Sequence, residues 1–251
     1  MHVRPALLAS FIKRLLRIRR REIVTIEGKF WVDPASYTGL ELAESGCYER
    51  GTLQVIHRIL RPGDTFIDIG ANEGYFTVVG SKIVGTSGRV LAVEPQARLA
   101  PVLARNLEEN QCTNTVVIQA AVSRCSGTAI LYLAPDMNTG SSGLTEATRY
   151  RVATQTTPLI SLAELLAQVP DAMPVVKMDI EGFEYDAILG SEAVFRSGVV
   201  RALIMEPHDH LLRKRNLDVG VLPRFLRSCG YEQAEFGEGR VWSRLGAISG
   251  L

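Results

Sequence analysis

The stretch DTFIDIGANEGYFTVVG, residues 64–80, constrains the fold more than any other part of the chain. After its first residue comes a nearly continuous apolar run in which Asp68 is the one acid, a pattern typical of a strand buried on both faces of a parallel sheet. Gly70 and Gly74 then form a turn, and residues 75–84 have the composition of a helix. A buried strand, a glycine turn and a helix in this order predict an α/β domain whose turn binds a nucleotide-like cofactor.

The rest of the chain continues this alternation. Near-continuous apolar runs predict strands, and apolar residues at helical spacing predict helices. The predicted strands are residues 65–70, 89–95, 115–122, 128–134, 174–180 and 199–207, and the predicted helices are residues 75–84, 97–111, 161–169, 185–195 (broken near Gly190) and 221–230. The last two runs, YEQAEF and GRVWSRL, predict an antiparallel hairpin around Gly237 and Gly239. We therefore predict a doubly wound, largely parallel sheet that ends in a β-hairpin.

Length and composition fit a reduced globular protein. A chain of 251 residues fits one large α/β domain, residues 46–251, preceded by an N-terminal segment, residues 1–45. The net charge of +1 provides no field that would attract nucleic acid, and the 4 cysteines form no C-x-x-C pair. Because no apolar run is long enough to span a membrane, we expect a cytoplasmic protein.

The N-terminal sequence RPALLASFIKRLLRIRRRE places apolar side chains at helical spacing among many basic ones. One interpretation is a basic amphipathic helix, residues 1–21, that lies on an anionic surface such as the inner membrane or docks on a partner. The other is a helix packed on the domain with its arginines in water. The sequence leaves both open.

The glycine turn indicates which cofactor is bound. A nicotinamide cofactor requires G-x-G-x-x-G, but Asn72 and Tyr75 occupy the second and third glycine positions. Asp68, just before the turn, repels a diphosphate and attracts an ammonium group. Glu94 ends the next strand, where a carboxylate accepts hydrogen bonds from two ribose hydroxyls. The ligand is thus a nucleoside that carries an amino acid in place of phosphates, a description that S-adenosylmethionine (SAM) fits.

Several separated motifs give a family resemblance. FIDIGANEGYFTVVGSKIVGTSGRVLAVEP, ARNLEENQCTNTVVIQAAVS and VVKMDIEGFEYDAILG resemble the FkbM family of SAM-dependent methyltransferases, over roughly residues 46–230. The resemblance implies a class I (Rossmann-like) methyltransferase fold with a seven-stranded sheet, whose antiparallel strand the final hairpin supplies. It also implies O-methylation of a hydroxyl on a small-molecule or glycan acceptor: a sugar, glycan, glycolipid or polyketide-like molecule. An N- or RNA methyltransferase and a catalytically silent, membrane-associated protein are the alternatives.

The resemblance also implies where the cofactor lies. The turn holds its methionine part, the acid after the second strand holds the ribose, and the segment of Ala121, Val122 and Ser123 lies by the adenine. The implied cofactor-binding residues are Glu49, Asp68, Gly70, Ala71, Asn72, Gly74, Tyr75, Phe76, Glu94, Pro95, Ala121, Val122, Ser123 and Asp179. Tyr48 and Glu49 belong to the segment that folds over the cofactor in the family. Glu73 stands where the family usually has an apolar residue.

Two acidic clusters at strand ends are candidates for the chemistry. Transfer of a methyl group to a hydroxyl requires alignment and is helped by a general base. KMDIEGFE offers Asp179, Glu181 and Glu184, and MEPHDH offers Glu206 and His208. We predict His208, Glu181 and Glu206 as catalytic residues. His208 is the better base because it titrates near neutrality, whereas Glu181 needs a raised pKa.

A divalent metal held by Asp179, Glu181, Glu206 and His208 is an alternative, but we assign no metal. Residues 135–155 are polar and predict a long loop that covers the acceptor. The residues of this loop predicted to bond the acceptor are Asn138, Thr139, Ser141 and Ser142.

Overall fold

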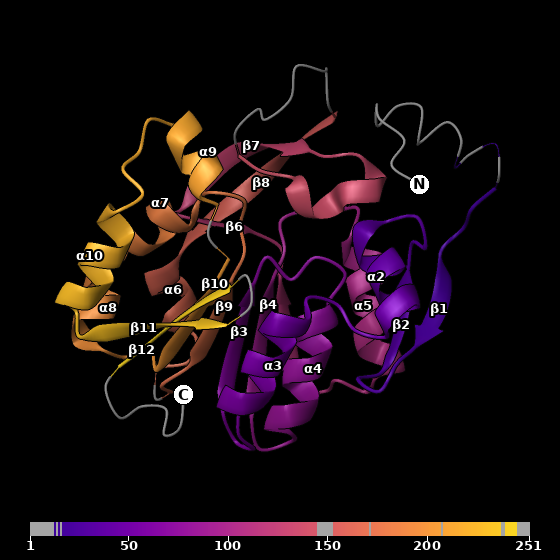
Figure 1. Ribbon diagram of the computed structural model, residues 1–251, viewed down its shortest axis with the longest axis horizontal. Coiled ribbons are helices and arrows are strands. Elements are labelled where there is room, and N and C mark those ends of the chain that lie inside the picture. Colours follow the sequence, from indigo (N-terminus) through magenta and orange to yellow (C-terminus); the bar gives the residue numbers. More distant parts are fainter. Residues whose placement is uncertain are drawn as a thin grey trace.

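The computed structural model describes residues 17–144, 153–170, 172–206, 208–236 and 239–244, together with Lys13 and Leu15 (Figure 1). Its strands are β1 (Arg21–Val24), β2 (Lys29–Val32), β3 (Thr65–Ile69), β4 (Arg89–Val93), β5 (Thr115–Ile118), β6 (Ala121–Ser123), β7 (Gly127–Leu133), β8 (Ala153–Ser161), β9 (Val175–Met178), β10 (Ala202–Met205), β11 (Tyr231–Phe236) and β12 (Gly239–Arg244). Its α-helices are α2 (Tyr37–Ser45), α3 (Arg50–Ile59), α4 (Tyr75–Val84), α5 (Ala100–Glu109), α6 (Leu162–Leu166), α7 (Glu184–Leu189), α8 (Glu192–Ser197), α9 (Asp209–Lys214) and α10 (Val221–Ser228). A 3₁₀ helix, η1, spans Asp136–Ser141.

The main sheet has seven strands in the order β11-β12-β10-β9-β3-β4-β5. The pairs β3–β4, β4–β5, β3–β9 and β9–β10 are parallel, whereas β12 is antiparallel to both of its neighbours. The predicted sheet, with its antiparallel strand in the terminal hairpin, is therefore confirmed. From β3 the chain builds outward to β4 and β5, and then returns to β9 on the other side of β3. This change of direction at the carboxyl ends of β3 and β9 is where such sheets bind ligands.

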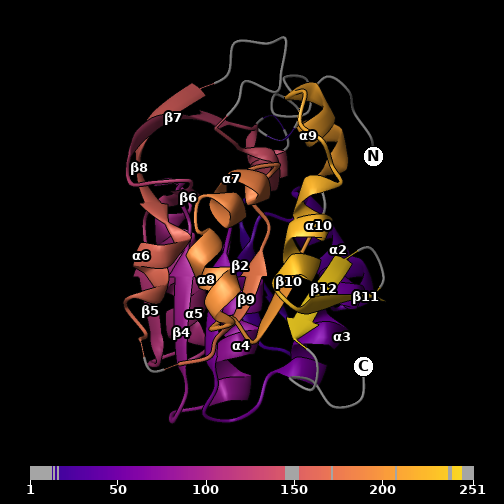
Figure 2. The ribbon, with the colours of Figure 1, turned by 90° about the vertical axis from the view of Figure 1, so that its left-hand side faces the viewer.

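Alternation along the strands divides the core into two layers. Phe66, Val90 and Val175 lie in one cluster with apolar residues of α3, α4 and α5. Ile67 and Leu91, one position along, lie in a second cluster with residues of α6, α7, α8 and α10. Helices thus cover both faces of the sheet, as Figures 1 and 2 show, and its central strands are buried for that reason.

A three-stranded sheet of order β6-β8-β7 lies above the main sheet in Figures 1 and 2 and corrects two predictions. The single strand predicted at 115–122 is two strands, because the chain leaves the main sheet after Ile118 and β6 pairs with β8 instead. The predicted loop 135–155 ends early, since β8 begins at Ala153. The polar sequence of β8 concealed a strand whose partner, β7, is distant from it in the chain. Residues 145–152 of this loop lie outside the described residues.

The described part of the N-terminal segment packs on the domain. Most of the predicted basic helix lies outside the described residues, but Arg20 forms an ion pair with Glu73 of the domain at 2.6 Å, and Lys13 forms one with Asp33 of its own segment. The buried side chain of Asn106 joins β2 to the cofactor turn: it accepts the N–H of Trp31 and donates to the carbonyl of Glu73. No described helix is long and apolar enough to cross a membrane. The division at residues 45 and 46 stays a prediction.

Helix boundaries mostly follow the sequence. The predicted break near Gly190 separates α7 from α8, and α6 begins with the capping box of Ser161 and Glu164. Helix α9 was not predicted, because its six residues include charged and imidazole side chains and no apolar stripe longer than one turn. Of the predicted hairpin turn, Gly237 lies outside the described residues, and Gly239 begins β12.

Candidate active site

Two adjoining cavities lie at the carboxyl ends of β3, β4 and β9. The space in the first, counted together with its solvent-filled opening, is about 580 Å³, and that in the second, counted in the same way, is about 310 Å³. Gly70, Asn72 and Asp179 line both, so the turn after β3 stands between them. A ligand with two unlike ends can therefore occupy both cavities and pass the turn between them.

The turn depends on its glycines. Gly70 has φ 82°, and a Cβ there would stand 1.9 Å from the carbonyl oxygen of Asp179. Gly74 has φ 88°, and a Cβ there would stand 2.5 Å from a methyl carbon of Leu103. Both positions thus combine left-handed backbone with close packing, which other residues cannot satisfy. These two glycines let β3, β9 and α5 approach closely enough to form the cavity walls.

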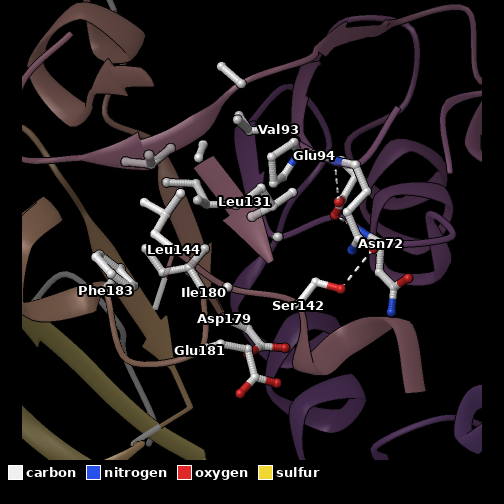
Figure 3. Close-up of a pocket in the computed structure, with 18 of the residues that line it drawn as sticks. Asn72, Val93, Glu94, Leu131, Ser142, Leu144, Asp179, Ile180, Glu181 and Phe183 are labelled. Atoms are coloured by element: carbon white, nitrogen blue, oxygen red, sulfur yellow. Dashed lines mark hydrogen bonds between the residues drawn. The ribbon is translucent and has the colours of Figure 1, made fainter. Parts of the chain in front are cut away.

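The first cavity suits an adenosine group (Figure 3). Val93, Val122 and Leu131 give it an apolar wall, and the buried carboxylate of Glu94 stands at its edge. Glu94 accepts the N–H of Asn72 at 2.8 Å and that of Gln96 at 2.9 Å, each on a different oxygen. Burial raises its pKa against these bonds. Since each carboxylate oxygen can accept a second bond, Glu94 can still bind ribose hydroxyls.

Most other predicted cofactor residues fall on these walls, and four predicted residues, one of them Gly74 of the turn, do not. Pro95 and Ala121 line the first cavity, and Ala71, Tyr75 and Phe76 line the second. Ser123, Glu49 and Asp68 line neither. Glu49 precedes α3 with φ 44°, and burial raises its pKa.

Asp68 points beneath the turn rather than into a cavity. It is 1% exposed, accepts a hydrogen bond from Thr77 at 2.6 Å, and lies 3.7 Å from the ammonium of Lys177. Asp68 and Lys177 are register neighbours on β3 and β9. The ammonium next to Asp68 in this structure is therefore the protein's own, and the predicted contact of Asp68 with the cofactor stays a prediction.

Lys177 is the central residue that sequence reasoning missed. Its ammonium, on a side chain 6% exposed, also lies 3.6 Å from Asp179 and donates to the carbonyl of Gly70 at 3.4 Å. Burial alone lowers its pKa, but the carboxylates of Asp179 and Asp68 outweigh this and hold the pKa above its usual range. A lysine inside the apolar run VVKM was the available signal, since a buried cation needs paired acids.

The predicted catalytic residues are brought together beside the first cavity. Donor atoms of Asp179, Glu206 and His208 lie within 4.8 Å of one another. His208 Nε2 is 3.7 Å from both Asp179 and Glu181, and its Nδ1 is 3.1 Å from Glu184. Figure 3 shows the carboxylates of Asp179 and Glu181 side by side. Since Lys177 already supplies a positive charge at Asp179, we assign no metal to this cluster.

The electrostatics reverse the predicted order of the bases. Burial and the charges of Asp179 and Glu184, partly offset by His208, raise the pKa of Glu181 to about 7. Burial, Asp179 and other acids likewise raise the pKa of Glu206 to about 7. Burial lowers the pKa of His208, but bonding to Glu184 and the neighbouring carboxylates outweigh it and raise that pKa to about 9. His208 is therefore an imidazolium at neutral pH, and Glu181 is the better base.

Two of the four residues predicted to bond the acceptor are hydrogen-bonded to residues that line the first cavity. Thr139 donates to the side-chain oxygen of Asn72 at 3.0 Å, and Ser142 donates to that of Gln96 at 2.9 Å. Asn138 and Ser141, both exposed, bond each other at 2.7 Å. The segment around η1 thus forms the cover of the first cavity, and its role toward the acceptor stays a prediction.

A seven-stranded sheet of this order, with a glycine turn and a buried acid at its switch point, defines a class I SAM-dependent methyltransferase domain. The Methyltransferase FkbM domain model matches residues 68–232, more than half of the chain. The chain belongs to the FkbM methyltransferase family, and SAM is its cofactor. A second model, for protein-L-isoaspartate(D-aspartate) O-methyltransferase, matches residues 9–125.

The curated relatives match only part of the chain. Protein-L-isoaspartate O-methyltransferase 1 of Arabidopsis thaliana is 29% identical over 38% of this chain and 42% of its own length. Ribosomal RNA large subunit methyltransferase E of Azoarcus sp. (strain BH72) is 33% identical over 35% of this chain and 42% of its own length. The chain thus matches less than half the length of these relatives.

Solved structures show a looser likeness. Methyltransferase FkbM from Methylobacillus flagellatus KT is 14% identical, with a TM-score of 0.49 over 76% of this chain and 50% of that chain. Fibrillarin from Aeropyrum pernix, in complex with natively bound SAM, is 12% identical, with a TM-score of 0.44 over 78% of this chain and 76% of that chain. The family assignment rests on the domain model instead.

Replacing Lys177 by methionine should destabilise the fold by about 3–5 kcal/mol, because Asp68 is left buried without its cation. Urea denaturation gives the free energy of unfolding. The double variant with Asp68→Asn should lose less than the sum of the two single changes. Strictly additive losses would show that the pair does not interact.

Replacing Glu94 by glutamine should weaken binding of S-adenosylhomocysteine about 10- to 100-fold, as expected for the loss of charged hydrogen bonds. Isothermal calorimetry measures the affinity. The matched control is Glu108→Gln, an exposed acid on α5. If Glu94→Gln binds as the wild type does, Glu94 does not hold the ribose.

Proposed function

We propose that this chain transfers the methyl group of SAM to a hydroxyl on a sugar, glycan, glycolipid or polyketide-like acceptor. The observation that carries the proposal is the group Asp179, Glu181, Glu206 and His208, of which the first two line the first cavity. Hydroxyl acceptors are poor nucleophiles at neutral pH and react faster when a general base accepts their proton. A carboxylate of raised pKa can act as that base, and carboxylates with raised pKa values are common at active sites.

The residues of the site divide the work. When bound, SAM supplies a methyl group on a cationic sulfur. Gly70, Asn72 and Asp179 separate its two ends, and the carboxylate of Asp179 favours positive charge at that junction. Glu181 lines the cavity and accepts the proton of the acceptor hydroxyl, while the imidazolium of His208 stabilises the ionised form of Glu181. Most of the acceleration comes from holding the acceptor in line with the methyl group.

Nitrogen and RNA acceptors are the rivals, and one curated relative bears the name of an rRNA methyltransferase. The net charge of +1 supports a small or glycan acceptor over nucleic acid. Incubating the protein with methyl-labelled SAM and fractionated cell extract, with mass spectrometry of the labelled product, identifies the acceptor atom. Label on nitrogen or on RNA contradicts the proposal.

The rate of methyl transfer should rise through pH 7, because Glu181 must be ionised to accept a proton and its pKa is about 7. Glu181→Gln should abolish this rise in rate with pH. A carboxyl whose folded pKa is raised favours folding below its unfolded pKa and loses that stability as pH rises towards 7. Glu181→Gln should therefore gain stability relative to the wild type between pH 5 and 8 in thermal unfolding. An unchanged pH–rate profile would exclude Glu181 as the base.

We also propose a cytoplasmic location and contact with anionic membranes through residues 1–21. The exposed side chains of Arg17, Arg19 and Arg21 support it, whereas Lys13 and Arg20 are paired with the carboxylates of Asp33 and Glu73. In a flotation assay the protein should bind vesicles that contain phosphatidylserine and ignore neutral ones, and removal of residues 1–21 should abolish binding. Equal recovery with both vesicle types would refute a charge-driven contact.

A further inference from the structure

One buried carboxylate, that of Glu184, contacts both the turn after β9 and the segment after β10 that carries His208. Glu184, the first residue of α7, is 2% exposed. Its Oε1 accepts the N–H of Ile180 at 3.0 Å and that of Gly182 at 3.4 Å, and it lies 3.1 Å from Nδ1 of His208. A single oxygen thus holds the turn after β9 and the ring that follows β10.

Helix α9 and its flanking residues also contact the turn after β9. His208, Leu211 and Arg215 fall on one helical face. A Cβ at Gly182 would stand 2.8 Å from Cβ of Leu211, and Arg215 donates to the carbonyl of Gly182 at 2.6 Å. Arg215 also pairs with Asp186 at 2.6 Å and stacks on the ring of Phe183 at 4.3 Å. The turn is therefore held from both sides.

The turn needs this support because its backbone is unfavourable. Glu181 has φ 54°, a left-handed conformation that residues other than glycine rarely adopt, and Gly182 follows with φ 87°. Such a conformation persists only where the surroundings enforce it, and it occurs often at functional sites. Here it directs the side chain of Glu181 to the wall of the first cavity.

We propose that Glu184 is a positioning residue for methyl transfer, because one buried oxygen fixes both the ring of His208 and the turn that presents Glu181. The inference rests on the proposed function. Glu184 lines neither cavity, so it acts through these two residues and not on the cofactor. The hydrogen bond at Nδ1 leaves Nε2 of His208 to face Asp179 and Glu181.

Four carboxylates in the described part of the chain surround His208, and the exchange Glu184→Gln removes the charge of one of them. Glu184 faces it from α7, Asp179 and Glu181 from the turn after β9, and Glu206 from its own segment; the ring of His210 lies 6.3 Å away. Of these, Glu184 alone contacts Nδ1. Glutamine keeps the size and an accepting oxygen but removes the charge.

The first test requires no acceptor. Imidazole NMR of the full-length chain follows the titration of His208, assigned with His208→Gln. In the wild type we expect a midpoint well above that of a free histidine, about 6.5. Glu184→Gln should lower this midpoint by at least one pH unit, whereas Glu192→Gln, at the matching first position of α8, should not. An unchanged midpoint in Glu184→Gln overturns the proposal.

The second test separates positioning from cofactor binding. Glu184→Gln should bind S-adenosylhomocysteine within twofold of the wild type and lose about 100-fold in kcat on the acceptor found by labelling. Glu184→Asp, which keeps the charge on a shorter chain, should recover part of this loss. If Glu184→Gln loses affinity and kcat in parallel, or loses neither, the proposal fails. Should the wild type transfer no methyl group at all, the proposed function fails, while the His208 titration still decides the role of Glu184.

Discussion

The buried ammonium of Lys177 is the interaction on which the site depends. It stands between the carboxylates of Asp68 and Asp179 and bonds the carbonyl of Gly70, so it joins the carboxyl ends of β3 and β9 at their point of contact. Without this cation, the two carboxylates would lie near each other with no positive charge between them, which would destabilise the folded state strongly. The glycine turn, and the cavities on either side of it, are held in place by this arrangement.

The group of Asp179, Glu181, Glu206 and His208 shows that the surroundings of a side chain can set its pKa more strongly than its residue type does. Histidine titrates near neutrality in water and glutamate does not, yet the acids that surround His208 hold its proton, and burial beside other acids gives Glu181 a pKa of about 7. The acids that act most on His208 lie more than 20 residues from it in the chain, whereas the two that act most on Glu181 lie within three residues of it. This group also contains a strained residue, Glu181, and an unusually dense set of charges, both of which are common where structure serves chemistry.

The sequence predicted those features that depend on local pattern. Strand β3, helix α4, the break between α7 and α8 and the terminal hairpin follow from periodicity and from glycine positions. It failed where distant pairing decides the structure. Ile118 and Ala121 belong to different sheets because β6 finds its partner in β8, and the polar sequence of β8 indicates a strand only once β7 lies beside it. The same holds for the site: the place of Glu94 beside the first cavity follows from its position after a strand, whereas the pairing of Asp68 with Lys177 requires the register of two strands distant in sequence.

The link between Glu73 and Arg20 has an evolutionary consequence. Glu73 is buried in the cofactor turn, where the family resemblance leads one to expect an apolar residue, and the arginine that balances it comes from the N-terminal segment. Loss of Arg20 alone would leave a buried carboxylate without its cation beside the second cavity, whereas loss of Glu73 alone would leave an arginine that is a quarter exposed. Grafting this turn into a relative that lacks the arginine would therefore carry over an unpaired buried acid along with the motif.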